Sequence, residues 1–222
     1  RHYIGSSQTV VDLMAEREDP RLPYYDFSIG GDVTGVPGDA TLAALTETVN
    51  EPIWLENGAA NLAIFSESEI YFILAEAQAM LGQDASEAFE TAVASNLVEY
   101  FEICDDEIAD EDVAAYIAAI QPLFAANALK EIRIQKYLAQ TRGEMIETYN
   151  DIRRIKYTDG EYAVALTNPN NTSSLGNRWP LRLPYGESDV TSNPNVAAAF
   201  GSGNDAGMYI FTENVWWAGG SR

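Results

Sequence analysis

The chain has 222 residues, enough for one substantial domain with its own hydrophobic core or for two small domains. Its hydrophobic content of 46% is typical of a folded globular protein, and 34 acidic against 13 basic residues give a formal net charge of −21. This charge argues against a nucleic-acid partner, because phosphate binding draws on clustered Lys and Arg. The sequence also contains no apolar run of about eighteen residues, the length that predicts a membrane-spanning helix.

The chain begins with a predicted helix and continues into loops. Residues 7–18 place Val10, Leu13 and Met14 at helical spacing, and Pro20 ends this pattern. Partial alternation in LPYYDFSI predicts a short strand. Glycine and proline residues then predict a long loop, and the irregular stretch 41–65 carries Trp54.

Two antiparallel helices joined at a glycine are predicted next. Ser66 and Glu69 form a capping-box pattern that begins a helix over 67–81, and Gly82 ends it. Asp84 offers the same kind of start for a second amphipathic helix. Small alanines near the corner indicate a hairpin of the tetratricopeptide type.

The acidic run CDDEIADED is interpreted as the start of a helix. It lacks the central Gly and the Glu spacing of a calcium loop, so we expect Asp110 to cap the Ala-rich helix that meets Pro122 near its end. Residues 128–156 then predict two helices with a tight corner at Gly143. After Lys156 the pattern predicts a polar loop, an extended WPLRLPY segment and a strand-like piece around 208–211.

Few kinds of chemistry fit this sequence. His2 is the only histidine, which argues against Ser- or Cys-based triads and against His-based metal sites. The 34 acids leave a glycosidase pair open, although abundance is no evidence of placement. No glycine-rich phosphate loop occurs. We therefore predict no catalytic residue, no metal site and no cofactor.

Aromatic side chains outside the predicted helices are the candidate ligand-binding residues. Sugar rings present apolar C–H faces that stack on Trp and Tyr, while their hydroxyls pair with polar side chains. The candidates are Tyr24, Tyr25, Trp54 and Trp179. The alternative for each is a ring packed over the helical core.

Several short motifs occur in a recognisable order. They are DPR at 19–21, YFILAEA at 71–77, AFETAVASN at 88–96, QKYLA at 135–139, YNDIRR at 149–154, RLPY at 182–185 and Asn-Pro-Asn at 193–195. In this order they resemble the carboxy-terminal part of the SusD/RagB family of nutrient-binding outer-membrane lipoproteins of Bacteroidetes. The resemblance extends from about Val10 to Trp217.

The resemblance implies a mainly α fold of tetratricopeptide-like helix pairs with long loops and a few short strands. Residues 1–222 would form the carboxy-terminal part of a SusD-like domain, with helical repeats over about 67–157 and loop-rich segments over about 19–66 and 158–222. It also implies a lipid-anchored Cys and the first helical repeats in a segment that precedes Arg1.

A set of polar motif residues is expected to form a structural scaffold that docks the RLPY segment onto the last long helix. The set comprises Glu147, Asn150, Asp151, Arg153, Arg154, Arg182 and Tyr185, together with Tyr149 and Pro184. We predict that Arg154 or Arg153 pairs with the carboxylate of Glu147 or Asp151, since Arg and Asp at helical spacing can pair and Arg presents a planar fork of donors.

By resemblance, the function is non-catalytic glycan binding at the cell surface, in a polysaccharide uptake system. The implied partners are an oligosaccharide ligand and a SusC-like TonB-dependent outer-membrane porter. Two alternatives stay open: a peptide-binding member of the same family, and a helical-repeat interaction scaffold.

Overall fold

The computed structural model describes residues 6–25, 35, 64–141, 143, 145–164 and 179–220. In chain order the elements are α1 (Gln8–Glu16), η1 (Leu22–Tyr25), α2 (Glu67–Met80), α3 (Ser86–Ile103), α4 (Asp110–Ala126), α5 (Ala128–Gln140), α6 (Met145–Asp159), α7 (Glu187–Ser192), α8 (Pro194–Phe200), η4 (Gly203–Asp205), α9 (Tyr209–Thr212) and η5 (Trp216–Ala218).

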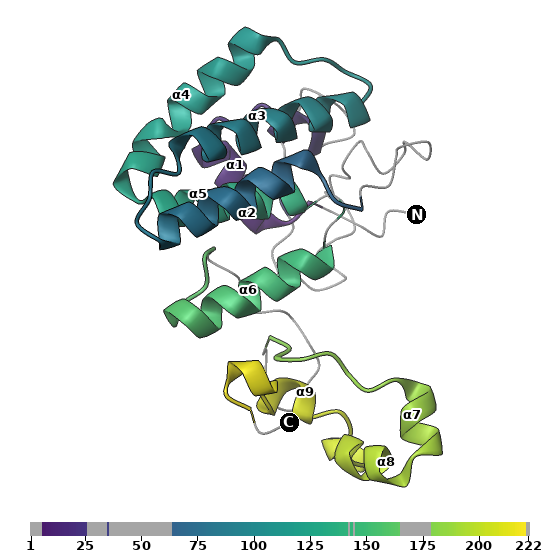
Figure 1. Cartoon of the computed structure of the whole chain (residues 1–222). Helices are drawn as coiled ribbons and strands as arrows, with labels where there is room; N and C mark the ends of the chain where they lie inside the picture. Colours follow the sequence, from purple (N-terminus) through teal and green to yellow (C-terminus); the bar gives the residue numbers. More distant parts are fainter. Residues whose placement is uncertain are drawn as a thin grey trace.

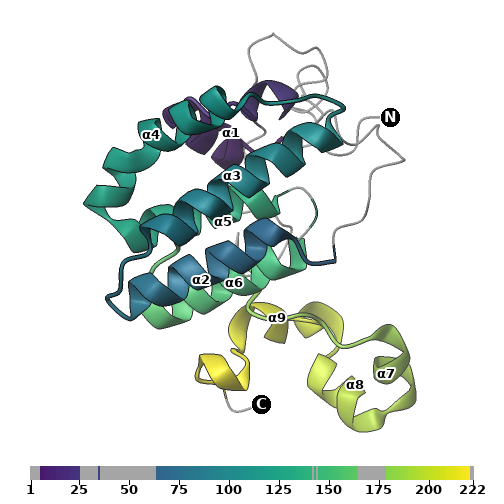
Figure 2. The ribbon, with the colours of Figure 1, turned by 45° about the horizontal axis from the view of Figure 1, so that its top comes forward.

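Helices α1 to α5 form the main body of the molecule (Figure 1). Helix α3 packs between α2 and α4, and α5 contacts all three of them. Helix α6 lies along the edge of this body, and the short helices α7 to α9 lie beyond it (Figures 1 and 2). The predicted mainly α fold built from helix pairs is therefore confirmed.

The hydrophobic core has two clusters, and α3 contributes to both. The first lies among α2 to α5 and includes Phe89 stacked on Phe124, with ring centroids 4.5 Å apart. The second joins α1, η1 and α5 around Met14 and Leu138. Burial of these apolar faces fixes where the polar faces of α1, α5 and α6 meet.

Local capping signals begin helices close to where they were predicted. The Ser66 side chain accepts a hydrogen bond of 3.1 Å from the Glu69 amide. Asn127 separates α4 from α5, and its side chain accepts one of 3.1 Å from the Lys130 amide. Asp110 differs from the prediction, because it is the first residue of α4 and Ala109 precedes it as N-cap without a side-chain bond. Its carboxylate still lies in the first turn, where the helix dipole favours negative charge.

The predicted strands are wrong within the described residues. Leu22–Tyr25 form the turn η1, in which the Tyr24 amide bonds to the Arg21 carbonyl at 3.1 Å. A strand would point Tyr24 and Tyr25 to opposite faces, whereas this turn buries both. Around 208–211 the chain forms α9, because the positive φ of 74° at Gly207 starts a turn whose amides bond three residues back. The described residues contain one isolated bridge position, at Ser7, and no strand.

Candidate ligand-binding site

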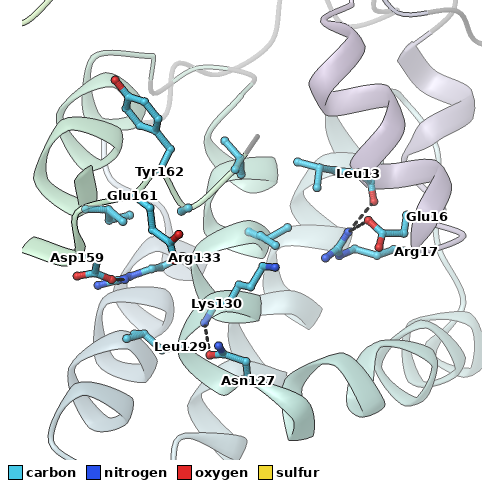
Figure 3. A pocket seen from close by; sticks show the side chains of 14 residues that line it. Leu13, Glu16, Arg17, Asn127, Leu129, Lys130, Arg133, Asp159, Glu161 and Tyr162 are labelled. Carbon is cyan, nitrogen blue, oxygen red and sulfur yellow. Dashed lines mark hydrogen bonds and ion pairs between the residues drawn. The ribbon is translucent and has the colours of Figure 1, made fainter. Parts of the chain in front are cut away.

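A groove of about 680 Å³ opens where α1, α5 and α6 meet (Figure 3). The end of α1, the first turns of α5, the end of α6 and residues 161–164 supply its walls. Its lining mixes charged, amide, aromatic and aliphatic side chains: Leu13, Glu16, Arg17, Asn127, Leu129, Lys130, Arg133, Ile134, Ile155, Asp159, Glu161, Tyr162, Ala163 and Val164. Its volume lies in the range that small-ligand sites occupy.

Arg17 is held rigidly at the α1 side of the groove. Its Nε and Nη2 donate to the two carboxylate oxygens of buried Glu131 at 2.9 and 2.8 Å. Its Nη1 donates to the Leu13 carbonyl at 3.0 Å and to the Glu16 carboxylate at 3.1 Å. Burial opposes the charge, but the hydrogen bonds and charge of Glu131 outweigh it, so the pKa of Arg17 is raised. The guanidinium is thus a permanent, fixed cation.

Arg133 and Asp159 form the opposite wall. The Arg133 guanidinium donates from Nε to Glu76 at 2.8 Å and from Nη1 to Asp159. Hydrogen bonds from Thr158 and then from Arg133 hold the pKa of Asp159 below its usual value. The Nη2 atom of Arg133 is buried and has no hydrogen-bond partner within the described part of the chain. This wall therefore carries the ionised carboxylate of Asp159 next to an N–H group of Arg133 that can still donate a hydrogen bond.

The mouth of the groove offers groups that a neutral polar ligand can use. Lys130 and Glu161 are exposed, and Asn127 is exposed at the joint between α4 and α5. The ring of Tyr162 is half-buried and lies 5.0 Å from the Lys156 ammonium. A site of this kind combines hydrogen-bond donors and acceptors with one aromatic face.

A second polar cluster ties α6 to the body of the protein. Buried Glu76 of α2 accepts from Arg133 at 2.8 Å and from Arg154 at 2.9 Å, and the Lys136 ammonium lies 3.8 Å from it. Asp151 completes the cluster with contacts of 2.5 Å to Lys136 and 3.1 Å to Arg154. The cluster positions α6, and hence one wall of the groove.

Comparison of the chain with known proteins identifies the family to which it belongs. Residues 1–185 match the SusD-like family described as "Starch-binding associating with outer membrane". The chain belongs to the SusD/RagB family. A crystal structure of a SusD/RagB family protein from Bacteroides thetaiotaomicron is 32% identical, with a TM-score of 0.77 over 98% of this chain and 50% of that chain. The crystal structure of a SusD homolog from Bacteroides fragilis, 19% identical, shares the fold with a TM-score of 0.66 over 87% of this chain and 48% of that one.

The chain spans about half the length of these two solved SusD/RagB structures. No curated protein matches it. In the part of the chain that the structure describes, no helix has both the length and the apolar character needed to span a membrane.

The SusD/RagB motif residues on α6 differ in what their side chains contact. The predicted pairing of Arg154 with Asp151 is confirmed, although the partner Glu76 was missed. Arg153 instead lies over two aromatic rings, 4.8 Å from Tyr149 and 5.1 Å from Trp217. Glu147 and Asn150 are exposed on the same helix.

The RLPY segment docks mainly on α9. The Arg182 guanidinium lies 5.3 Å from the Tyr185 ring and 5.2 Å from the Tyr209 ring. The two rings stack with centroids 4.9 Å apart, and the Tyr185 amide donates to the Tyr209 hydroxyl at 2.7 Å. The hydrogen bond to α6 is made just before this segment, where the Tyr149 hydroxyl donates to the Pro180 carbonyl at 3.1 Å. The contacts described for residues 182–185 themselves are with α9, which differs from the expected docking on α6.

Of the predicted binding aromatics, the three that the structure describes do not line the groove. Tyr24 and Tyr25 lie in the core with 9% and 3% of their surface exposed, where they pack against Tyr100. Their burial matches the alternative of rings packed over the helical core. Trp179 is half-buried, and Trp54 lies outside the described residues.

Sequence reasoning missed the groove itself. Arg17, Asn127, Lys130, Glu161 and Tyr162 carry no motif and come from three distant stretches of the chain. The one local signal was Asn127, a strong helix N-cap residue placed just before the ALKE helix start. The convergence of the other four side chains depends on how α1, α5 and α6 pack.

Proposed function

We propose that this protein binds oligosaccharides non-covalently at the cell surface, as a lipid-anchored component of a polysaccharide uptake system. Its partner would be a SusC-like TonB-dependent porter in the outer membrane, which takes the ligand inward. The observation that carries the proposal is the groove between α1, α5 and α6. The family description, starch binding in association with the outer membrane, supports the same ligand class.

The groove has the composition that sugar recognition requires. Hydroxyl groups both donate and accept, so a sugar needs acceptors such as Glu161 and donors such as Lys130 in one place. The half-buried ring of Tyr162 offers an apolar face for a C–H surface. Arg17 and Arg133 are already held by Glu131 and Glu76, so little conformational entropy is lost when a ligand binds.

The charge state of the groove favours binding over hydrolysis. A glycosidase needs one carboxylic acid that stays protonated, with its pKa raised, next to a second carboxylate. Asp159 has its pKa lowered by Thr158 and Arg133, which is the opposite direction. We therefore propose a binding protein without a catalytic step.

Isothermal titration with a panel of soluble polysaccharides and peptides tests the proposal, with each mixture checked for cleavage products. We expect saturable binding of one glycan and no cleavage. Tyr162→Ala should weaken that binding at least about threefold through loss of the ring face. Tyr157→Ala is the matched control, since Tyr157 is exposed near the end of α6, five residues before Tyr162, and does not line the groove. Binding of peptides alone would favour the peptide-binding alternative, and cleavage would contradict a non-catalytic role.

A further inference from the structure

Helix α6 carries its negative and positive charges on different sides. Its three acidic residues, Glu147, Asp151 and Asp159, are spaced by four and eight positions and so share one side of the helix. Asp151 and Asp159 form ion pairs with cations of α5. Glu147 lines a hollow between α2 and α6. The other side of α6 therefore carries no carboxylate of its own.

That other side carries two cations, each held against aromatic rings. Tyr149, Arg153 and Lys156 lie at i, i+4 and i+7, and we call them the cationic face of α6. The Arg153 guanidinium lies 4.8 Å from the Tyr149 ring centroid and 5.1 Å from that of Trp217. The Lys156 ammonium lies 5.0 Å from the Tyr162 ring centroid. Within the part of the chain that the structure describes, neither cation pairs with a carboxylate.

Unpaired cations are unusual in this protein. Acidic residues outnumber basic ones by 34 to 13 in the sequence, and Arg17, Arg21 and Arg133 each bind a carboxylate. Stacking on a ring orients a guanidinium through its flat face and leaves the N–H groups at its edge available. Arg153 is thus a positioned donor that lacks an acceptor among the described residues.

Next to the cationic face the chain displays an exposed indole ring. Trp216 is 74% exposed, the largest value among the aromatic residues that the structure describes. Its turn, η5, is closed by the Gly220 amide, which donates to the Val215 carbonyl at 2.9 Å. The adjacent Trp217 lies over Arg153 and joins this turn to α6 (Figure 1). An indole held in solvent in this way offers an apolar surface for a flat ligand.

We propose that the cationic face of α6, together with Trp216, binds an anionic sugar, one that carries a carboxylate or sulfate group. The planar donors of Arg153 match the oxygens of either group, and Lys156 adds a second positive charge. The apolar C–H face of the sugar ring stacks on the indole. This site is separate from the groove and rests on the proposed glycan-binding function only for its ligand class.

The net charge of −21 is compatible with an anionic ligand at this position. Salt screens exposed charges beyond about 8 Å at physiological ionic strength, so the two cations in contact with the ligand dominate its binding. Nucleic acid is the less favourable anion, because a phosphate chain draws on a longer run of Lys and Arg than the two residues present here.

Isothermal titration of the 222-residue chain with matched trisaccharides tests the proposal. The ligands are a galacturonic acid trimer, sulfated maltotriose and neutral maltotriose. We expect an anionic trimer to bind, and the tighter of the two identifies the acidic group. Lys156→Gln should weaken this binding at least about threefold and Arg153→Gln at least about tenfold. Lys156→Arg, which keeps the charge, is the matched control and should bind within about twofold of the unmodified protein. Neither Gln variant should change the affinity for maltotriose.

Four outcomes would overturn the proposal. The first is failure of both anionic trimers to bind, whereas the proposed function fails only if the wider glycan panel also gives no binding. The second is equal affinity in Lys156→Gln, Arg153→Gln and the unmodified protein. The third is loss of binding in Lys130→Gln but not in Lys156→Gln, which places the anion in the groove. The fourth is tighter binding of a single-stranded oligothymidylate than of either trimer. Circular dichroism verifies that each variant keeps its helices.

Discussion

Arg154 Nη2 donates hydrogen bonds to both carboxylate oxygens of Glu76 at 2.9 Å, and so joins α6 to α2 across 78 residues of sequence. The Glu76 side chain is 7% exposed, whereas that of Arg154 is 36% exposed. Arg133 and Lys136 also approach the same carboxylate. One buried carboxylate thus contacts three cations from two helices, and Asp151 and Asp159 supply further negative charge to them.

Glu76→Gln should lower the free energy of unfolding by about 3 kcal/mol, because removal of a buried ion-pair partner leaves uncompensated charge. Arg154→Ala should cost less, about 1 kcal/mol, since solvent screens a side chain that is 36% exposed. Urea unfolding measures both values. Glu67→Gln, exposed at the start of the same helix, is the control and should stay within about 0.5 kcal/mol. A Glu76→Gln variant as stable as this control would refute the structural role of the cluster.

The DPR motif folds around a second buried ion pair. Arg21 donates from Nε and Nη2 to Asp19 at 2.8 and 2.5 Å, and also to Asn96 at 2.5 Å and Gln135 at 3.1 Å. The Tyr116 hydroxyl donates to Asp19 at 2.7 Å. Burial and then the charge of Asp19 raise the pKa of Tyr116, which keeps this donor protonated.

Arg21→Lys should destabilise the protein by about 3 kcal/mol, because an ammonium cannot reproduce four hydrogen bonds made by a planar guanidinium. Asp19→Asn should cost a similar amount. The double variant should cost clearly less than the sum, since each single change breaks the same pair. Thermal and urea unfolding provide the three values. Strict additivity would show that the two side chains act independently.

Local signals predicted most helices and few of the contacts between them. Periodic apolar residues and the Ser66 cap depend on neighbours within a few positions, so the sequence predicted helix positions within a few residues. The turn at Tyr24 and Tyr25 escaped prediction, because partial alternation resembles a strand when the burial of both rings is unknown. The local preference of these residues for a strand is overridden by the packing of both rings against α3.

The candidate site was harder to predict for the same reason. Arg154 and Asp151 are three positions apart on one helix, so their pairing could be read from spacing. Glu76 is a non-local partner that no periodic pattern identifies. The groove combines residues near 17, 130 and 162, and no local rule relates these stretches before the helices pack.

The alkaline stability of the protein should depend on Tyr25. Burial raises the pKa of Tyr25 to about 12, above the value near 10 of an unfolded chain. Between these values the unfolded state loses the proton first, so stability is full below pH 10 and falls as pH rises toward 12. The loss from this one group is about 3 kcal/mol, on the order of 1.4 kcal/mol for each pKa unit.

Urea unfolding at pH 8, 10 and 11.5 measures this dependence. Tyr25→Phe keeps the ring and the Tyr25 carbonyl that accepts from Ser6 at 2.8 Å, but removes the ionisable hydroxyl. The variant should lose some stability at pH 8 with the 2.8 Å contact to Thr141, and should fall less steeply above pH 10. Equal slopes in the two proteins would rule out Tyr25 as the source.

Tyr149 links α6 to the carboxy-terminal part of the chain through its hydrogen bond of 3.1 Å to the Pro180 carbonyl. Tyr149→Phe should therefore lower the free energy of unfolding by about 1 kcal/mol, the net value of one such bond. The ring stays in place under Arg153, so α6 itself should remain folded.

Limited proteolysis should cleave the 179–220 segment faster in the Tyr149→Phe variant, because local opening of this segment becomes easier. Tyr157→Phe, with a ring that is 54% exposed, is the matched control and should be cleaved at the rate of the unmodified protein. Equal cleavage rates for Tyr149→Phe and the control would mean that the stacking around Tyr209 holds the segment without this bond.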